Sequence, residues 1–167
     1  YSTRWFPYPY PQISAVEGPV SGMEYPMVAM EARDETKEGL YSVITHEIGH
    51  HVQNQMGTMR EFDQAAARMD ERRRNALTVR LELQADCYAG VWGFYAAKRN
   101  LLEPGDVEEG LRAASAVGDD TIQKRTQGYT VPDAFTHGKA EQRVRWFRTG
   151  FKSGDPRSCN TFAAKDV

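Results

Sequence analysis

Apolar residues after position 36 recur at the spacing of helices that bury one side. Five segments carry this pattern, at 36–55, 58–74, 75–98, 107–117 and 139–152, with three or four residues from one apolar position to the next. Gly57 and the pair Pro104 and Gly105 interrupt the series, as residues that end helices do. We expect the longest segment to be the core helix, with a buried stripe formed by Leu77, Leu81, Ala85, Tyr88, Trp92 and Tyr95.

The first 35 residues follow a different pattern, which predicts extended structure. Prolines at 7, 9 and 11 exclude a helix there, and residues 13–20 and 23–30 are candidate strands. Pro26 favours an edge strand, whose unpaired backbone groups could accept an extended peptide. We therefore expect one α+β domain over residues 1–167. It would be mainly helical, with a small N-terminal antiparallel sheet in 1–45 and a helical metal-binding part in 46–167.

Composition narrows the classes of protein that the chain could represent. Of its 167 residues, 40% are hydrophobic and 26% are charged, and the net charge is -2. These are values of an ordinary soluble domain, and they argue against a nucleic-acid partner or a polybasic membrane patch. The longest apolar run, 88–97, has about half the length of a membrane span, so no span is expected. Cys87 and Cys159 could form a disulfide, or Cys87 could be a buried free thiol, which leaves the compartment open.

The predicted helix 36–55 carries the residues with the clearest chemistry. His46 and His50 lie one turn apart on one face, where two imidazoles can bind one metal ion. Glu47 would lie beside that ion, where it can accept a proton from a water whose pKa the ion lowers. The histidines fall about 200° from an apolar row, so this face should line a cleft while the row anchors the helix in the core. The row consists of Leu40, Ile44, Ile48 and Val52.

A catalytic zinc needs a third protein ligand and one open position. Glu82 is the predicted ligand, because it lies at the margin of the core helix, where its charge would be costly without a cation. Asp86, one turn further on, is placed to accept the second ring N–H of a ligand histidine. The alternative is that both acids lie at a solvated helix boundary.

Three ordered motifs resemble the bacterial neutral zinc metallopeptidase family. They read HEIGHHVQ at 46–53, LELQAD at 81–86, and FTH at 135–137 followed by QRV at 142–144. The same order resembles the membrane-bound CAAX-prenyl and heat-shock metalloproteases, which implies a zincin of the gluzincin type. By that resemblance Glu82 is the third zinc ligand, Asp86 orients a histidine and His137 faces the substrate carbonyl. A loop histidine such as His137 can also be plain polar surface, and Arg143 could bind substrate or only brace the loop.

The first 45 residues instead resemble the approach to the metal helix in the aminopeptidase N family. The matching stretches read WFPY at 5–8, GMEYP at 22–26 and TKEGL at 36–40. This resemblance implies that Glu24 binds the free amino group of a substrate. Gly22, which has no side chain, would let the substrate approach the backbone closely. The likeness stops at the metal helix, because Met69 occupies the position of that family's third ligand.

The sequence therefore predicts a zinc-dependent endopeptidase with one Zn²⁺ per chain, acting on peptides or unfolded proteins. Glu47 would deprotonate the attacking water and His137 would steady the oxyanion. Three alternatives stay open: an aminopeptidase anchored by Glu24, a zinc hydrolase of small amides or esters, and a zinc-stabilised interaction module without catalysis. Glu47 argues against the module, since a structural site has no use for a base. A bacterial extracytoplasmic or membrane-associated location is favoured, and the sequence indicates neither the natural substrate nor the oligomeric state.

Overall fold

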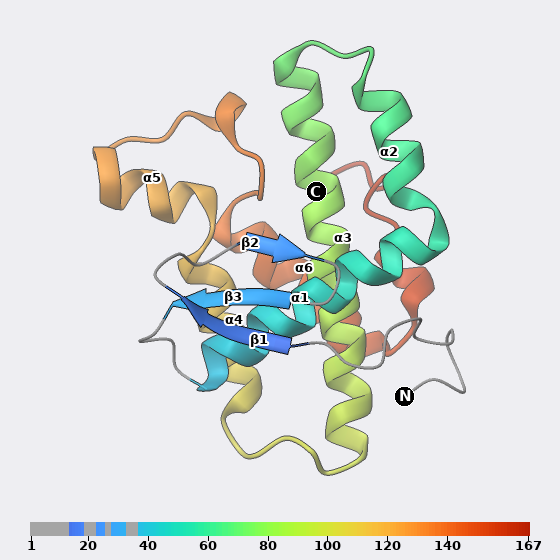
Figure 1. Ribbon diagram of the computed structural model, residues 1–167, viewed down its shortest axis with the longest axis vertical. Coiled ribbons are helices and arrows are strands. Elements are labelled where there is room, and N and C mark those ends of the chain that lie inside the picture. Colours follow the sequence, from blue (N-terminus) through green and yellow to red (C-terminus); the bar gives the residue numbers. More distant parts are fainter. Residues whose placement is uncertain (1–13, 19–22, 26–27, 33–36) are drawn as a thin grey trace.

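Figure 1 shows the computed structural model, which describes residues 14–18, 23–25, 28–32 and 37–167, with side chains from residue 44 onward. Helices occupy most of the described chain, and short 3-10 turns follow in its last third. The helices are α1 (Lys37–Met56), α2 (Thr58–Ala66), α3 (Glu71–Lys98), α4 (Asp106–Ala116), α5 (Asp119–Gln127) and α6 (Ala140–Ser153), and the 3-10 turns are η1 (Pro132–Ala134) and η2 (Pro156–Cys159).

The strands form a mixed sheet, so the expected small antiparallel sheet is wrong. β1 (Ser14–Gly18), β2 (Met23–Tyr25) and β3 (Val28–Ala32) are arranged in the order β1-β3-β2. β2 runs antiparallel to β3, whereas β1 runs parallel to it. The alternation of apolar and polar residues does not encode strand direction, and β1 pairs with β3 rather than with the next strand along the chain. The expected α+β class is accordingly corrected to a mainly helical fold.

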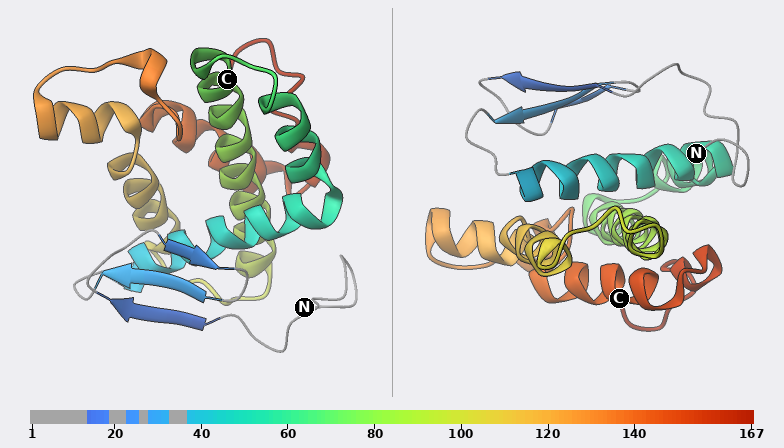
Figure 2. Two further views of the ribbon diagram at one scale, coloured as in Figure 1. Left: turned by 45° about the horizontal axis from the view of Figure 1, so that its top comes forward. Right: turned by 90° about the horizontal axis from the view of Figure 1, so that it is seen from below.

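Helix α3 forms the centre of the helical part. Figure 2 shows α1 crossing it on one side and α6 on the other. The contact with α6 is made by backbone, because a Cβ at Gly150 would collide with the carbonyl group of Cys87. With neighbours on two sides, α3 buries more than the single predicted stripe, whose last residue, Tyr95, is exposed. The hydrophobic core consists of Val79, Leu83, Cys87, Tyr88, Val91, Phe135, Trp146 and Cys159.

Helix α1 meets α3 through the side that carries the histidines. A Cβ at Gly49 would lie 2.6 Å from the carbonyl oxygen of Ala85, so the two backbones touch. Gln53, one turn further along, is fully buried. The predicted apolar row is only half-buried at positions 44, 48 and 52, and the side chain of Leu40 lies outside the described residues. The sheet lies on the face of α1 away from α3 (Figure 2), so α1 has neighbours on both faces.

The predicted helix 58–74 is wrong beyond Ala66, where α2 ends. The side chain of Asp70 accepts a hydrogen bond of 2.9 Å from the backbone N–H of Arg73 and so begins α3 at Glu71. Aspartate is among the preferred residues at this capping position. The helix-forming arginines at 72–74 follow closely, so residues 71–74 were assigned to the preceding helix although they begin α3.

A disulfide between Cys87 and Cys159 answers the question that the sequence left open. Its Cα atoms are 5.5 Å apart and both cysteines are fully buried. The bridge fastens η2, which follows α6, to the middle of α3. None of the described helices combines the length and the apolarity that crossing a membrane requires.

Candidate metal centre

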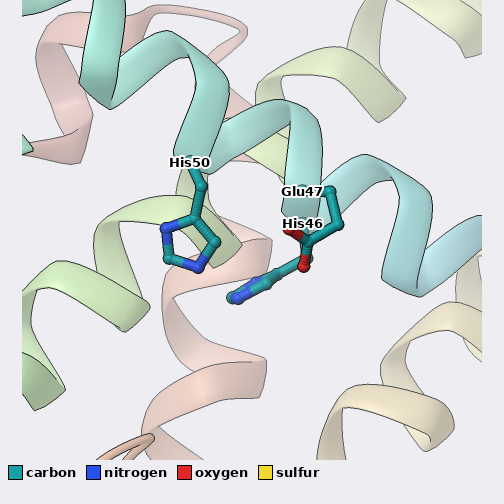
Figure 3. A group of neighbouring side chains, drawn as sticks. All are labelled: His46, Glu47 and His50. Carbon is teal, nitrogen blue, oxygen red and sulfur yellow. The ribbon is translucent and has the colours of Figure 1, made fainter. Parts of the chain in front are cut away.

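Helix α1 places two histidines and a glutamate close together. His46 and His50 lie one turn apart with their ring centroids 4.6 Å apart, the edge of one ring toward the face of the other. Figure 3 shows both rings and the carboxylate of Glu47 projecting from one stretch of the helix. One ligand atom from each of the three lies within 4.8 Å of the others, a spacing that could hold a metal ion.

Glu82 of α3 completes the set from the opposite helix. Its Oε2 atom lies 3.1 Å from Nε2 of His46 and 3.4 Å from Nε2 of His50. The same nitrogen of each ring therefore faces one carboxylate oxygen. Two imidazole nitrogens and a carboxylate oxygen that converge in this way are the donor set of many catalytic zinc sites.

The other ring nitrogen of each histidine meets a hydrogen-bond acceptor. Nδ1 of His46 lies 2.8 Å from Oδ1 of Asp86, and Nδ1 of His50 lies 2.8 Å from Oε1 of Gln53. A carboxylate or amide oxygen only accepts, so each Nδ1 must be the donor. In the neutral form of each ring, Nε2 then carries the lone pair that could bind a metal.

Arg143 of α6 holds Asp86 in place. Its Nε and Nη2 atoms each donate a hydrogen bond of 2.8 Å to the Asp86 carboxylate, and the side chain is 7% exposed. Burial raises the pKa of Asp86, but Arg143 and His46 outweigh it and bring the value to about 2. Asp86 is thus ionised and able to accept from His46. Arg143 thus holds Asp86 of α3, rather than the loop before α6 that it was expected to brace.

The acids Asp86 and Glu82 favour positive charge on the histidine that lies between them, His46. Burial lowers the pKa of His46, but Asp86 and Glu82 raise it to about 10. Burial raises the pKa of Glu82, but both histidines hold it well below its ordinary value. A proton on His46 therefore occupies the place, between ring and carboxylate, that a metal cation would take. The residues present fit a zinc ion.

His137 lies in the loop before α6, which Asp119 organises. One oxygen of Asp119 accepts hydrogen bonds of 2.8, 2.7 and 2.9 Å from the backbone N–H groups of residues 136–138. Its other oxygen lies 3.6 Å from Nδ1 of His137, whose side chain is 53% exposed. Asp119 raises the pKa of His137, with a further contribution from the charge of Glu82, so His137 lies within electrostatic range of the cluster.

Comparison with known proteins identifies the chain. Residues 31–162 match the family described as "Putative neutral zinc metallopeptidase". The chain belongs to this family. The match confirms the resemblance stated for residues 46 onward and begins before them, whereas the likeness of residues 1–45 to aminopeptidase N is not shown.

Relatives of the chain occur in several bacteria. The uncharacterized protein YpfJ of Escherichia coli is 52% identical over 120 residues, which cover 72% of this chain and 42% of that protein. The uncharacterized protein Mb2605 of Mycobacterium bovis is 46% identical over 135 residues, which cover 75% of this chain and 44% of that protein. The chain thus spans less than half of the length of these relatives. No solved structure matches it.

Some residues of the site were missed by sequence reasoning, and some predicted ones cannot be placed. Gly22 and the side chain of Glu24 lie outside the described residues. Gln53 and Asp119 had not been singled out, although each makes direct contact with a predicted site residue. Gln53 follows His50 by three residues, on the same face of a helix. A search for an acceptor to serve each ligand histidine would have found it.

Proposed function

We propose that this chain carries the catalytic site of a zinc-dependent endopeptidase. The observation that carries the proposal is the convergence of both Nε2 atoms on Glu82, while each Nδ1 is held by an acceptor. His46, His50 and Glu82 are the proposed ligands of one Zn²⁺, and Asp86 orients His46. Zinc, when bound, would polarise the scissile carbonyl group and lower the pKa of a water molecule.

Glu47 is the proposed general base. One of its carboxylate oxygens lies within 4.8 Å of a ring nitrogen of each histidine, yet Glu82 is the acid whose oxygen approaches both Nε2 atoms at 3.1 and 3.4 Å. This division leaves Glu47 to accept a proton from the attacking water. As the C–N bond breaks, Glu47 passes that proton to the leaving amine, so that one water is added across the peptide bond.

His137 is the proposed donor to the carbonyl oxygen. The raised pKa keeps its ring protonated to higher pH than an ordinary histidine, and Asp119 fixes the loop that carries it. A cationic donor aimed at the developing negative charge stabilises the transition state. With more than half of its side chain exposed, His137 can be reached by a substrate.

A peptide digest tests this function. Zinc-loaded protein should cleave a broad peptide library, and removal of zinc by a chelator should abolish cleavage reversibly. Glu47→Gln should bind zinc as the parent does yet lose nearly all turnover, because the ligands remain and the base is gone. Glu61→Gln, at an exposed acid of α2, is the matched control and should keep full activity. Tight zinc binding without cleavage of any peptide would favour the interaction module.

The position of cleavage separates the endopeptidase from the aminopeptidase alternative. The aminopeptidase would use the Glu24 carboxylate, with Gly22 beside it, to pair with the free α-amine of a substrate. We expect internal cleavage of extended peptides whether the N-terminus is free or acetylated, read by mass spectrometry. Release of single N-terminal residues from free peptides only, abolished by Glu24→Ala, would establish the aminopeptidase instead.

A further inference from the structure

Gln53 is a buried amide whose hydrogen bonds fix its orientation. It is fully buried, and its NH₂ group donates to the carbonyl oxygen of Leu81 at 2.7 Å and to Oε1 of Gln84 at 3.0 Å. Two acceptors on the NH₂ side fix which end of the amide is oxygen. That oxygen faces Nδ1 of His50 at 2.8 Å.

Gln84 extends the chain of hydrogen bonds to the disulfide. Its oxygen accepts from Gln53, and its NH₂ group donates to the backbone carbonyl of Cys159 at 3.0 Å. Cys159 is fully buried and is bonded to Cys87 of α3. This chain of hydrogen bonds, from His50 through Gln53 and Gln84 to Cys159, is called the relay below. Its inner end is the ring of His50, and its outer end is anchored by the disulfide.

The relay gives His50 one tautomer and one orientation. Each amide can point only one way, because reversing Gln53 would set its oxygen against the oxygens of Leu81 and Gln84. Nδ1 of His50 is then the donor, and in the neutral ring Nε2 carries the lone pair. His46 obtains the same result from a charged partner, Asp86, whereas the partner of His50 is neutral.

We propose that Gln53 is the positioning residue of the zinc ligand His50. Gln53 is itself held by Gln84, and Gln84 by the backbone carbonyl of Cys159, which the disulfide keeps in place. The proposal rests on the zinc site of the proposed function. It does not depend on whether the site cleaves peptides.

Zinc affinity tests the contact between Gln53 and His50. Gln53→Met keeps the approximate size of the side chain and removes the acceptor, so it should weaken zinc binding about ten- to a hundredfold, measured by competition with a chromophoric chelator. Gln55→Met, two residues on and exposed, is the control and should bind as the parent does. In nitrogen-15 NMR of the zinc-bound protein, the Nδ1–H of His50 should exchange slowly in the parent and rapidly in Gln53→Met. Equal zinc affinity of Gln53→Met and the parent would overturn the proposal.

Two further changes test the relay as a unit. Gln84→Met should also weaken zinc binding, and the double variant should be no weaker than Gln53→Met alone, because both substitutions break one path. Replacing both cysteines, as Cys87→Ala with Cys159→Ala, should weaken zinc binding several-fold in protein that circular dichroism shows to be folded. Additive losses in the double variant, or parental affinity without the disulfide, would overturn the relay. If Gln53→Met does not fold, Gln84→Met decides in its place.

The outcomes also separate this inference from the proposed function. A parent protein that binds no zinc contradicts both. A parent that cleaves peptides through zinc, with Gln53→Met equal to it in zinc affinity, contradicts the relay alone.

Discussion

At the scale of single residues, two glutamates near the histidines differ in which atoms they meet. Glu82 approaches both Nε2 atoms, and both histidines hold its pKa well below the ordinary value. Glu47 lies on the same helix as the histidines, and one of its oxygens lies within 4.8 Å of a ring nitrogen of each. The contact with both Nε2 atoms supports the proposal that Glu82 is the third ligand, and this proposal has a direct test.

Glu82→Ala should abolish tight zinc binding, because two histidines alone leave the ion without its third protein ligand. Glu71→Ala, at the exposed first residue of the same helix, should keep full occupancy. Elemental analysis of the purified proteins measures both. The reverse result, with zinc lost in Glu71→Ala and kept in Glu82→Ala, would show that the ligand assignment is wrong.

The pairing of His137 with Asp119 predicts a pH dependence. Asp119 raises the pKa of His137 above 6.5, so the ring keeps its proton to higher pH. If the protonated ring is the active form, activity holds at lower pH and falls as pH rises through this pKa. Asp119→Asn removes the charge but keeps an acceptor for the backbone N–H groups, so it should lower the pKa and move the fall in activity to lower pH.

The alkaline limb of the pH–rate profile measures this shift. Asp120→Asn is the control, because Asp120 accepts a hydrogen bond of 2.8 Å from the backbone N–H of Ala140. It should leave the limb unchanged. An unmoved limb in Asp119→Asn would mean that His137 does not set the pH dependence.

The residues proposed as metal ligands could be predicted from sequence, whereas Gln53 and Asp119, which support other residues of the site, could not. The spacing of His46 and His50 and the cost of an unpaired charge at Glu82 are local properties that a helix pattern reveals. Gln53 resembles any polar residue of a helix until its partners on α3 are known. Asp119 likewise has no signal in the sequence, because its partners lie in a loop seventeen to nineteen residues further on.

At the scale of elements, the site depends on how closely α1 and α3 approach. Gly49→Ala would place a methyl group 2.6 Å from the carbonyl oxygen of Ala85, and backbone cannot yield as a side chain can. The helices must separate, which should cost about 1–3 kcal/mol of the free energy of unfolding. Zinc affinity should fall as well, because His46 and His50 move away from Glu82.

Gly110→Ala in α4 is the matched control for that change. An added Cβ there meets nothing within 4 Å, so the variant should be neutral or more stable by up to about 1 kcal/mol. Urea denaturation of both variants measures the difference. If Gly49→Ala were as stable as Gly110→Ala, the backbone contact would not limit the approach of the helices.

Most helices could be predicted from periodicity, but their partners could not. α1 was expected at 36–55 and lies at 37–56, since its pattern is continuous and Gly57 ends it. Which side of α1 packs on α3 was read from the apolar row, whereas Gly49 and Gln53 lie in that contact. Apolar content marks the side that avoids water, but close backbone contact requires a side without bulk.

At the scale of the whole molecule, the disulfide closes a long stretch of chain. Cys87 and Cys159 are 72 positions apart in the sequence, and the stretch between them includes α4, α5 and α6. Linking positions this far apart restricts the unfolded chain, so replacing both cysteines by alanine should lower the free energy of unfolding by about 4 kcal/mol. For a chain of this size the melting temperature should fall on the order of 10 °C.

Calorimetry of the metal-free parent and of the double cysteine variant measures this loss. Both samples must lack zinc, since a ligand that binds only the folded state adds its own stabilisation. Identical melting temperatures would contradict the expectation. Sequence alone could not settle this bridge, because the distance between the two cysteines depends on how α6 packs on α3.

The direct contact of α1 with α3 also bears on the size of the ion that the site can hold. Helices that touch through side chains can adjust their separation by changing rotamers, whereas Gly49 and Ala85 touch through backbone. The nitrogens on one helix and the oxygen on the other thus keep a set spacing. An ion with longer bonds, such as calcium at about 2.3–2.6 Å, would have to push the helices apart and lose their packing. An ion with shorter bonds, such as zinc at about 2.0–2.2 Å, would not, so we expect the close helix crossing to disfavour larger ions.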